Sequence, residues 1–286
     1  MSLKRTLVNA LDRPGGRKFL SLIASVHARL KTGAHVGIFF DGEQWIHRVN
    51  GHFFPDGPSF PYYSSSVSAW LDEPDIYFRN AEKYWYKFYH PRPGDIILDI
   101  GAGRGEGALP MSRAVGLSGR VVAVEAMPPS FDLLKKLCAL NNIRNVLPVH
   151  AAVADKSGVM YAQPSPSGHW QMDVVVADRP EGCSVHEVRS LTVDELCSEL
   201  KITGVAFLKM NIEGAERLAL PGAVRTLRKT RSVCISCHDF RADHGEEEHF
   251  RTRAFTEQFL CSHGFELRRF AYQYDFERDL VYAIRR

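Results

Sequence analysis

The sequence predicts an α/β fold with a doubly wound, mostly parallel seven-stranded sheet whose last strand runs antiparallel. From residue 91 onward, short apolar runs alternate with stretches of helical periodicity. This alternation is typical of βαβ units, in which helices cover both faces of a parallel sheet. The last two apolar runs leave no room for a helix between them, so we expect them to form an antiparallel pair at one edge.

Seven runs of mainly apolar residues are the expected strands: 95–100, 120–126, 146–153, 205–212, 232–239, 265–272 and 279–285. Helices are expected at 108–116, 130–142, 192–200, 215–229 and 248–264. Ser130 is the expected N-cap of the second helix, and Gly264 the expected stop of the last.

Two regions do not follow this alternation. Residues 154–190 combine turn signals with short β-prone runs, which predicts β structure inserted after the third strand. Residues 1–90 are rich in aromatic residues and prolines, and we expect a basic helix, a hairpin and a long loop there. The predicted domains are therefore an accessory region, 1–90, and a main domain, 91–286.

Composition narrows the function classes. A formal net charge of +3 is too small for a dedicated nucleic-acid binder, and no apolar run approaches the roughly 20 residues of a membrane span. The basic N-terminal helix is expected to pack on the protein, with a peripheral membrane contact as the alternative. The six cysteines form no framework, so we expect free thiols in the cytoplasm. A homo-oligomer is left open.

The first expected strand ends in Asp99, and a loop with glycines at alternate positions follows it: Gly101, Gly103 and Gly105. Such a loop lets the backbone approach a ligand closely at the carboxyl edge of a sheet. The spacing G-x-G-x-G differs from the dinucleotide pattern G-x-G-x-x-G. Glu106, at the start of the helix, would repel a pyrophosphate, which argues against an NAD-dependent oxidoreductase.

A cofactor without phosphate fits this loop better, and we predict S-adenosyl-L-methionine. Asp99 is expected near the ammonium of its amino-acid tail. Glu125, at the end of the second strand, can accept hydrogen bonds from both ribose hydroxyls. The full predicted cofactor site is Asp99, Gly101, Ala102, Gly103, Gly105, Glu106, Glu125, Ala126, Met127 and Ala152.

A second polar group follows the fourth strand in the run FLKMNIEGAERLALPGA, residues 207–223. Lys209, Asn211 and Glu213 alternate and would share one face of the strand until the turn begins. Polar side chains at a buried strand end need partners or a role. For Lys209, a supporting hydrogen-bond network and a functional role both stay open.

The ordered blocks PGDIILDIGAGRGE, VVAVEAMPPSFDLLKKLCALNN, HAAVAD, SLTVDEL and FLKMNIEGAERLALPGA resemble the FkbM family of S-adenosylmethionine-dependent methyltransferases over roughly residues 91–240. The resemblance implies a class I, Rossmann-like methyltransferase fold. It also implies methylation of a hydroxyl on a sugar, a polysaccharide precursor or a secondary metabolite. The chain departs from the family pattern at Asn211, where an aspartate is usual, and at Gly103-Arg104, where the usual loop has an asparagine and its neighbour.

The predicted catalytic residues are His238, Glu213 and Asn211. Methyl transfer to a hydroxyl benefits from a base, and His238, next to Asp239 at the end of the fifth strand, suits that role near neutral pH. Glu213 is the second candidate base. Asn211 has no basic group and can only orient cofactor or acceptor.

Other interpretations stay open. The Asn211 departure allows a non-catalytic binding or assembly protein. An N- or nucleic-acid methyltransferase is a further alternative, although the Asn/Asp-Pro-Pro-aromatic block of amino-directed enzymes is replaced by NIEG. No metal is predicted, because residues 238–249 lack a tight ligand spacing. Ser165, Ser167, His169 and Trp170 are candidates for a lid over a small-molecule or carbohydrate acceptor.

Overall fold

A computed structural model describes residues 3–61, 71–165 and 173–286. The chain forms two compact units: Met1–Arg79 with Lys135–Asn142, and Asn80–Leu134 with Ile143–Arg286. The division of the chain after residue 90 stays a prediction.

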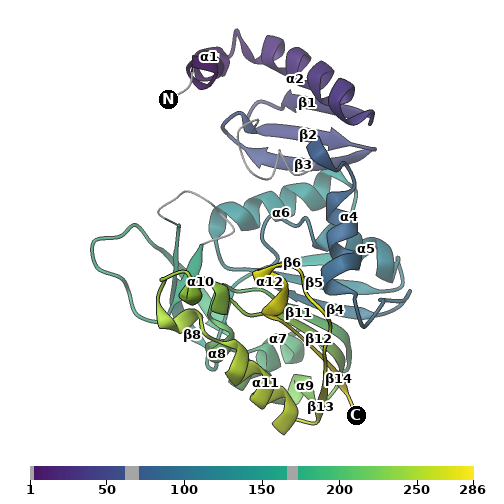
Figure 1. Cartoon of the computed structure of the whole chain (residues 1–286), viewed down its shortest axis with the longest axis vertical. Coiled ribbons are helices and arrows are strands. Elements are labelled where there is room, and N and C mark those ends of the chain that lie inside the picture. Colours follow the sequence, from purple (N-terminus) through teal and green to yellow (C-terminus); the bar gives the residue numbers. More distant parts are fainter. Residues whose placement is uncertain (1–2, 62–70, 166–172) are drawn as a thin grey trace. The chain divides into compact units, whose positions relative to one another are not determined.

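The second unit contains a seven-stranded sheet in the order β13-β14-β12-β11-β4-β5-β6 (Figure 1). Its strands are β4 (Ile96–Ile100), β5 (Arg120–Glu125), β6 (Val146–His150), β11 (Val205–Met210), β12 (Thr230–Ser236), β13 (Phe265–Arg268) and β14 (Leu280–Arg285). Neighbours from β6 to β12 pair parallel, whereas β14 pairs antiparallel with both β12 and β13. The predicted class I methyltransferase fold is therefore confirmed, with all seven strands and the antiparallel last strand.

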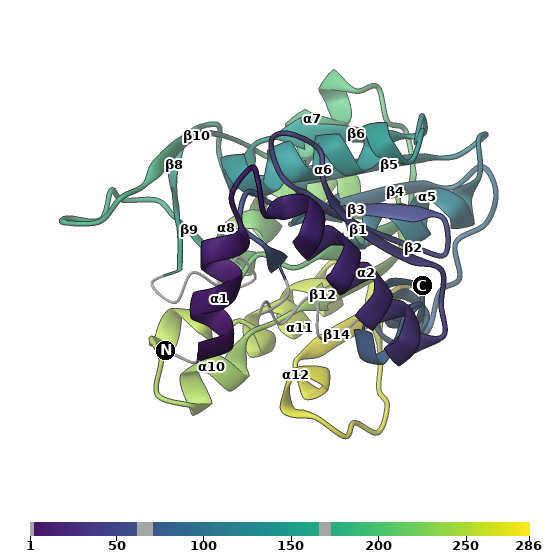
Figure 2. The same cartoon turned by 90° about the horizontal axis from the view of Figure 1, so that it is seen from above.

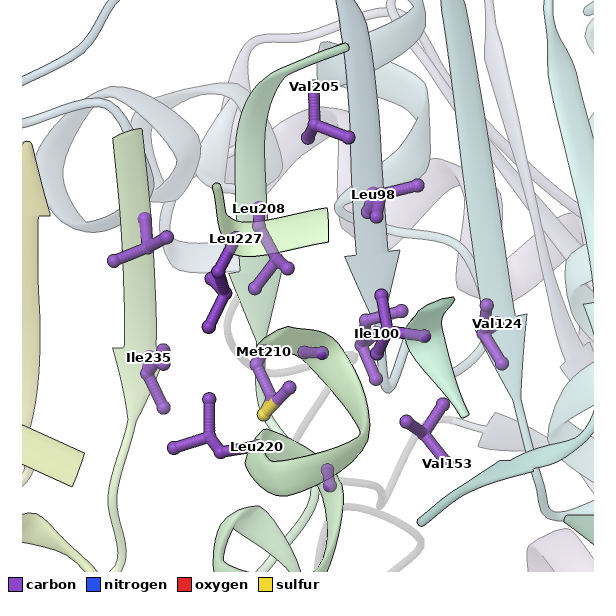
Figure 3. Close-up of a cluster of buried hydrophobic side chains, with 14 of the residues drawn as sticks. Leu98, Ile100, Val124, Val153, Val205, Leu208, Met210, Leu220, Leu227 and Ile235 are labelled. Atoms are coloured by element: carbon purple, nitrogen blue, oxygen red, sulfur yellow. The ribbon is translucent and has the colours of Figure 1, made fainter. Parts of the chain in front are cut away.

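One face of this sheet packs on helices that follow β10, β11 and β12. They are α7 (Val193–Glu199), α8 (Glu216–Ala219), the 3-10 segment η4 (Leu220–Ala223), α9 (Val224–Leu227) and α11 (Arg253–Ser262). Leu98, Met210 and Ile235 belong to the resulting core, together with Leu220 and Leu227. Figure 3 shows these side chains gathered between the strands and the segment after β11.

The opposite face is covered by α5 (Ala108–Val115), which contacts β4 and β5, and by the segment after the π-helical turn η2 (Ala81–Trp85). Tyr86 and Tyr89 pack on Phe207, whose neighbour in β11, Leu208, lies in the core of the first face. Successive residues of a strand point to opposite faces. Lys209 therefore lies on the same face of β11 as Phe207, where it can meet its register partner Asp99 of β4.

Helix boundaries differ from the prediction at three places. The helix expected over 248–264 forms as α11 only from Arg253 to Ser262, after a separate 3-10 turn at Glu248–Phe250. Helix α6 (Pro128–Leu140) begins at its first proline, so Ser130 lies inside the helix and the prediction that it caps the helix is wrong. Proline suits the first helical position because its missing N–H has no helical partner there. The helix expected over 215–229 is broken at η4, since Pro221 cannot donate a helical hydrogen bond. Gly264, with a φ of 83°, follows the end of α11 as expected.

After β6 the chain enters a second, four-stranded sheet in the order β7-β10-β8-β9. These strands are β7 (Ala152–Val153), β8 (Gly158–Gln163), β9 (Val174–Val176) and β10 (His186–Leu191). Short helices follow the main strands: α10 (Asp239–Asp243), η5 (Glu248–Phe250) and α12 (Asp275–Arg278).

The first unit consists of α1 (Leu3–Leu11), α2 (Arg17–Thr32) and the antiparallel sheet β1-β2-β3, with strands Val36–Phe40, Trp45–Val49 and His52–Gly57. Helix α4 (Ile76–Asn80) ends it. Helix α2 lies along β1 (Figures 1 and 2), and its Leu20, Ala24 and Ala28 pack against a core that includes Trp45. Within the described residues, no helix has the length and apolar character needed to cross a membrane.

Candidate functional site

The glycine loop lies at the carboxyl edge of the main sheet, directly after β4. Gly101, Gly103 and Gly105 have φ values of 76°, 57° and 94°, which favour glycine. The amides of Gly101 and Ala102 both donate to the carbonyl of Val124 at 2.9 Å, so the start of the loop is tied to β5. A Cβ on Gly101 would stand 1.9 Å from the carbonyl oxygen of Asn211, and only glycine fits this position.

Asp99 and Lys209 form a buried ion pair beneath this loop. They are register partners on β4 and β11, and Lys209 Nζ lies 2.8 Å from Asp99 Oδ1. The same ammonium donates to the carbonyl of Gly101 at 2.6 Å and lies over the ring of Trp85. Lys209 therefore supports the loop from below, as the network interpretation expects.

The second carboxylate oxygen of Asp99 is buried and has no hydrogen-bond donor among the described residues. The hydroxyl of Tyr86 is buried and without a partner in the same part of the chain. Burial raises the pKa of Tyr86, and the negative charge of Asp99 raises it further. A buried carboxylate with spare acceptor capacity fits an ammonium group or an ordered water.

Glu125 lies at the end of β5 with its carboxylate tied to two backbone amides. Its Oε2 accepts from Gly103 N at 2.7 Å, and its Oε1 accepts from Met127 N at 2.8 Å. Burial raises the pKa of Glu125 although these two hydrogen bonds lower it. Each oxygen can accept one more hydrogen bond, so Glu125 fits the two hydroxyls of a ribose and gains from added donors.

The remaining predicted cofactor residues lie around the same edge. Ala126 and Met127 follow β5, and Met127 packs with Ala152 of β7 and Met160 in a small apolar cluster. Glu106 lies half-buried in the turn before α5. This cluster gives the site an apolar wall beside Glu125, suited to a flat ring.

Glu213 and His238 meet where β11 and β12 end. Glu213 Oε1 lies 2.9 Å from His238 Nε2, and Glu216 Oε1 lies 3.6 Å from His238 Nδ1. Glu216 is fully buried and accepts a hydrogen bond from Thr252 Oγ1 at 3.0 Å. Glu213 itself has a φ of 53°, a strained conformation for a non-glycine residue that aims its side chain at His238.

The carboxylates around His238 favour the protonated, imidazolium form of its ring. Burial lowers its pKa, but Glu213 and Glu216 outweigh burial and raise the pKa of His238 to about 10. The role of His238 as a base near neutral pH stays a prediction, and the raised pKa favours the form of the ring that cannot accept a proton. Asp239, the neighbour of His238 in sequence, accepts at its Oδ2 from the amides of Thr252 and Arg253 at 3.0 Å, and the carboxylates that reach the ring are those of Glu213 and Glu216.

Arg241 completes the group from the other side. Its Nη1 donates to Glu213 Oε2 at 2.8 Å, while Nε and Nη2 donate to Glu246. The guanidinium also stacks on Phe250, with its carbon 3.8 Å from the ring centre. Glu213 is thus held between two cations, one on each oxygen.

The backbone of Asn211 contacts the end of β4 and the glycine loop. Its N–H donates to the carbonyl of Ile100 at 2.9 Å, and its carbonyl packs on Gly101. Asn211 therefore joins the glycine loop to the turn that carries Glu213, and the two predicted groups lie at one edge of the sheet.

Some residues of the site were not predicted. Glu216 lies within the block IEGAE, so its position carried a signal, and Arg241 stands three residues after His238 without any motif. Ser165 donates its backbone N–H to Asp173, whereas Ser167, His169 and Trp170 of the predicted lid lie outside the described residues. Among the residues that the structure describes, no group of three or more His, Cys, Asp or Glu side chains is arranged to hold a metal.

Comparisons with solved structures find similar folds at low identity. A fibrillarin of Aeropyrum pernix with bound S-adenosyl-L-methionine is 19% identical, with a TM-score of 0.44 over 85% of this chain and 83% of that one. The methyltransferase FkbM of Methylobacillus flagellatus is 16% identical, with a TM-score of 0.48 over 75% of this chain and 51% of that one. A methyltransferase of Aquifex aeolicus is 14% identical, with a TM-score of 0.43 over 77% and 97%.

No curated protein sequence matches this one. The model of the methyltransferase FkbM domain matches residues 99–267, which include the glycine loop, Glu125, Glu213 and His238. Because this match spans more than half of the chain, the protein belongs to the FkbM family and is an S-adenosylmethionine-dependent methyltransferase.

Proposed function

We propose that the protein methylates a hydroxyl group of a small molecule, namely a sugar, a polysaccharide precursor or a secondary metabolite. One observation carries this proposal: the Glu213 carboxylate stands at the end of β11 between His238 and Arg241, at 2.9 and 2.8 Å. The resemblance to hydroxyl-methylating relatives supports it.

The cofactor side of the site would be formed by the glycine loop and Glu125. Gly101, Gly103 and Gly105 let the backbone approach the ligand, Glu125 would accept from the ribose hydroxyls, and Asp99 would act on the ammonium end directly or through water. When bound, S-adenosylmethionine supplies a methyl group that is already activated by its positive sulfur. The protein's own task is therefore to position the acceptor and remove its proton.

We assign the proton-accepting role to Glu213. Because the pKa of His238 is raised to about 10, its ring is protonated at neutral pH. We therefore assign it the role of orienting the carboxylate rather than that of the base. A carboxylate is in general a weak base, but a hydroxyl becomes strongly acidic as its oxygen forms a bond to carbon. A weak base placed within hydrogen-bond reach is then sufficient.

Hydroxyl acceptors are favoured over amino acceptors by the surroundings of Glu213. Amino-directed enzymes of this fold hold a nitrogen with an Asn/Asp-Pro-Pro-aromatic block, and the equivalent place here reads Asn211-Ile212-Glu213-Gly214. A carboxylate at this point suits a group that must lose a proton to react.

The experiment is transfer of a labelled methyl group from S-adenosylmethionine to a panel of sugars, hydroxylated metabolites and matched amines. With a working acceptor, Glu213→Gln is expected to lower kcat roughly 10²- to 10⁴-fold, the usual contribution of a general base. Glu246→Gln is the matched control, because it neutralises a carboxylate on the same Arg241 without touching His238. Labelling of amines alone, or equal activity of wild type and Glu213→Gln, would contradict the proposal.

A further inference from the structure

Helix α2 presents a second apolar face that its own unit does not bury. One side of the helix packs on the core through Leu20, Ala24 and Ala28. The other side exposes five large apolar side chains, called the outer stripe here: Phe19, Leu22, Ile23, Val26 and Leu30. Large apolar side chains grouped in this way mark an interaction surface more often than single exposed ones do.

The outer stripe is continuous along the helix. Its members follow the first at positions i+3, i+4, i+7 and i+11, a spacing that places them on one face. A helix of 16 residues is about 24 Å long, and the stripe runs along most of it. Leu22 and Leu30 are 63% and 82% exposed.

The helix cannot turn this stripe inward without losing its anchors. Ser25 exchanges hydrogen bonds with both the N–H and the carbonyl of Ile38, and Ser21 donates to the same carbonyl. Arg29 Nε donates to the carbonyl of Val36 at 2.6 Å. These side chains satisfy backbone groups of the edge strand β1, so the orientation of α2 on the sheet is fixed.

The charges beside the stripe are almost all positive. Exposed basic side chains accompany it on α2 and just before it, namely Arg13, Lys18 and Arg29, whereas Lys31 is paired with Asp72 at 2.6 Å. Asp12 is the single acidic residue between positions 3 and 32 of the sequence, and it is paired with Arg17 at 2.9 Å. This face of the helix therefore combines an apolar stripe with a surplus of positive charge.

We propose that the outer stripe of α2 docks on an anionic lipid surface, with the helix lying in the plane of the interface. Apolar side chains would enter the acyl boundary while the basic side chains contact lipid phosphates. A second copy of the chain fits less well, because a symmetric contact would bring two basic faces together. A neutral apolar partner would leave the positive charge without a counterpart.

The test is co-flotation of the full-length protein with vesicles of phosphatidylcholine alone and of equal parts phosphatidylcholine and phosphatidylglycerol. The protein is expected to float with the anionic vesicles, to stay behind with the neutral ones, and to be released by salt. Leu22→Ser combined with Leu30→Ser is expected to weaken anionic binding at least about tenfold, because two apolar side chains no longer enter the boundary. Lys18→Glu with Arg13→Glu should weaken it several-fold or more.

Leu117→Ser is the matched control, since Leu117 is 89% exposed in the second unit and lies outside the stripe; its binding should equal that of wild type. All variants are first compared by circular dichroism and thermal unfolding. No binding to either vesicle, equal binding to both, or unchanged binding of the Leu22/Leu30 variant would overturn the proposal. So would a wild-type dimer in the absence of lipid that the Leu22/Leu30 variant converts to a monomer.

Discussion

His238→Asn tests the charge network at the end of β11 and β12. The two carboxylates at His238 raise its pKa from 6.5 to about 10 against the opposing effect of burial. A folded-state pKa above the unfolded-state value means that the network stabilises the fold fully below pH 6.5 and that this stabilisation is lost as the pH rises through 10. His238→Asn should remove this pH dependence.

The size of the effect follows from the shift. A pKa that moves from 6.5 to about 10 corresponds to about 5 kcal/mol of pH-dependent stability, as an order of magnitude. His238 is only 3% exposed, so solvent screens this interaction little. At pH 7 the variant should also be destabilised by roughly 3–5 kcal/mol, because Glu213 and Glu216 lose the cation between them.

The assay is urea unfolding of wild type and variant at intervals between pH 6.5 and 10, with the difference in unfolding free energy plotted against pH. Taking the difference cancels the titration of cysteines, tyrosines and lysines that both proteins share. His35→Asn is the control, because His35 is exposed and lies in the first unit; its difference should stay near zero. A wild-type-minus-His238→Asn difference that does not fall with rising pH would refute the protonated state of His238.

Three further changes test the support of the site. Gly101→Ala should lower the free energy of unfolding by about 2 kcal/mol or more and abolish cofactor binding, because its Cβ would lie 1.9 Å from the Asn211 carbonyl oxygen. Gly107→Ala is the control, because the atom nearest to its Cβ is 3.8 Å away. Urea unfolding and calorimetry should show that this control is tolerated. Glu216→Gln should lower the pKa of His238, since one of its two carboxylate neighbours is neutralised, and an NMR titration of the ring measures this; an unchanged pKa would mean that Glu213 alone sets it. Thr192→Ala removes the capping box of α7, in which Thr192 Oγ1 accepts from Glu195 N at 2.9 Å, and should cost about 1 kcal/mol in thermal or urea unfolding; a neutral result would contradict the role of this cap.

The strands were predictable because each is a short apolar run between turn signals. The loop of Gly101, Gly103 and Gly105 was predictable for a different reason: a left-handed backbone leaves a glycine pattern that can be read in the sequence. Helix ends were less predictable. Helix α6 could begin at Pro128, because proline suits the first helical position, or after Ser130, because serine suits the N-cap. The local sequence does not decide between these two signals.

The chemistry of the site was only half accessible from sequence. Spacing placed Glu213 and His238 at neighbouring strand ends, but the protonation state of His238 depends on which carboxylates reach it in space. Asp239, the neighbour in sequence, turns to the backbone of Thr252, whereas Glu213 and Glu216 come from a different strand end. No sequence pattern shows that His238 is contacted by Glu213 and Glu216 instead of Asp239, because these contacts are set by the tertiary packing of β11 against β12.

The outer stripe of α2 was likewise visible as an amphipathic pattern, yet the sequence alone indicated packing on the protein. The structure shows that α2 has two apolar faces, and that the one built from Leu20, Ala24 and Ala28 is the one buried. Small residues allow close approach to β1, which leaves the larger side chains outside.

The most direct test of the account is calorimetric titration of the purified protein with S-adenosylmethionine and S-adenosylhomocysteine, with NAD as the control ligand, repeated on Glu125→Ala. The account predicts binding of both sulfur ligands, no binding of NAD, and an affinity lower by roughly tenfold or more in Glu125→Ala, because the ribose loses two charge-assisted hydrogen bonds. Wild-type affinity in Glu125→Ala, or no binding of either sulfur ligand by the wild type, would contradict the assignment of the glycine loop and Glu125 as the cofactor site.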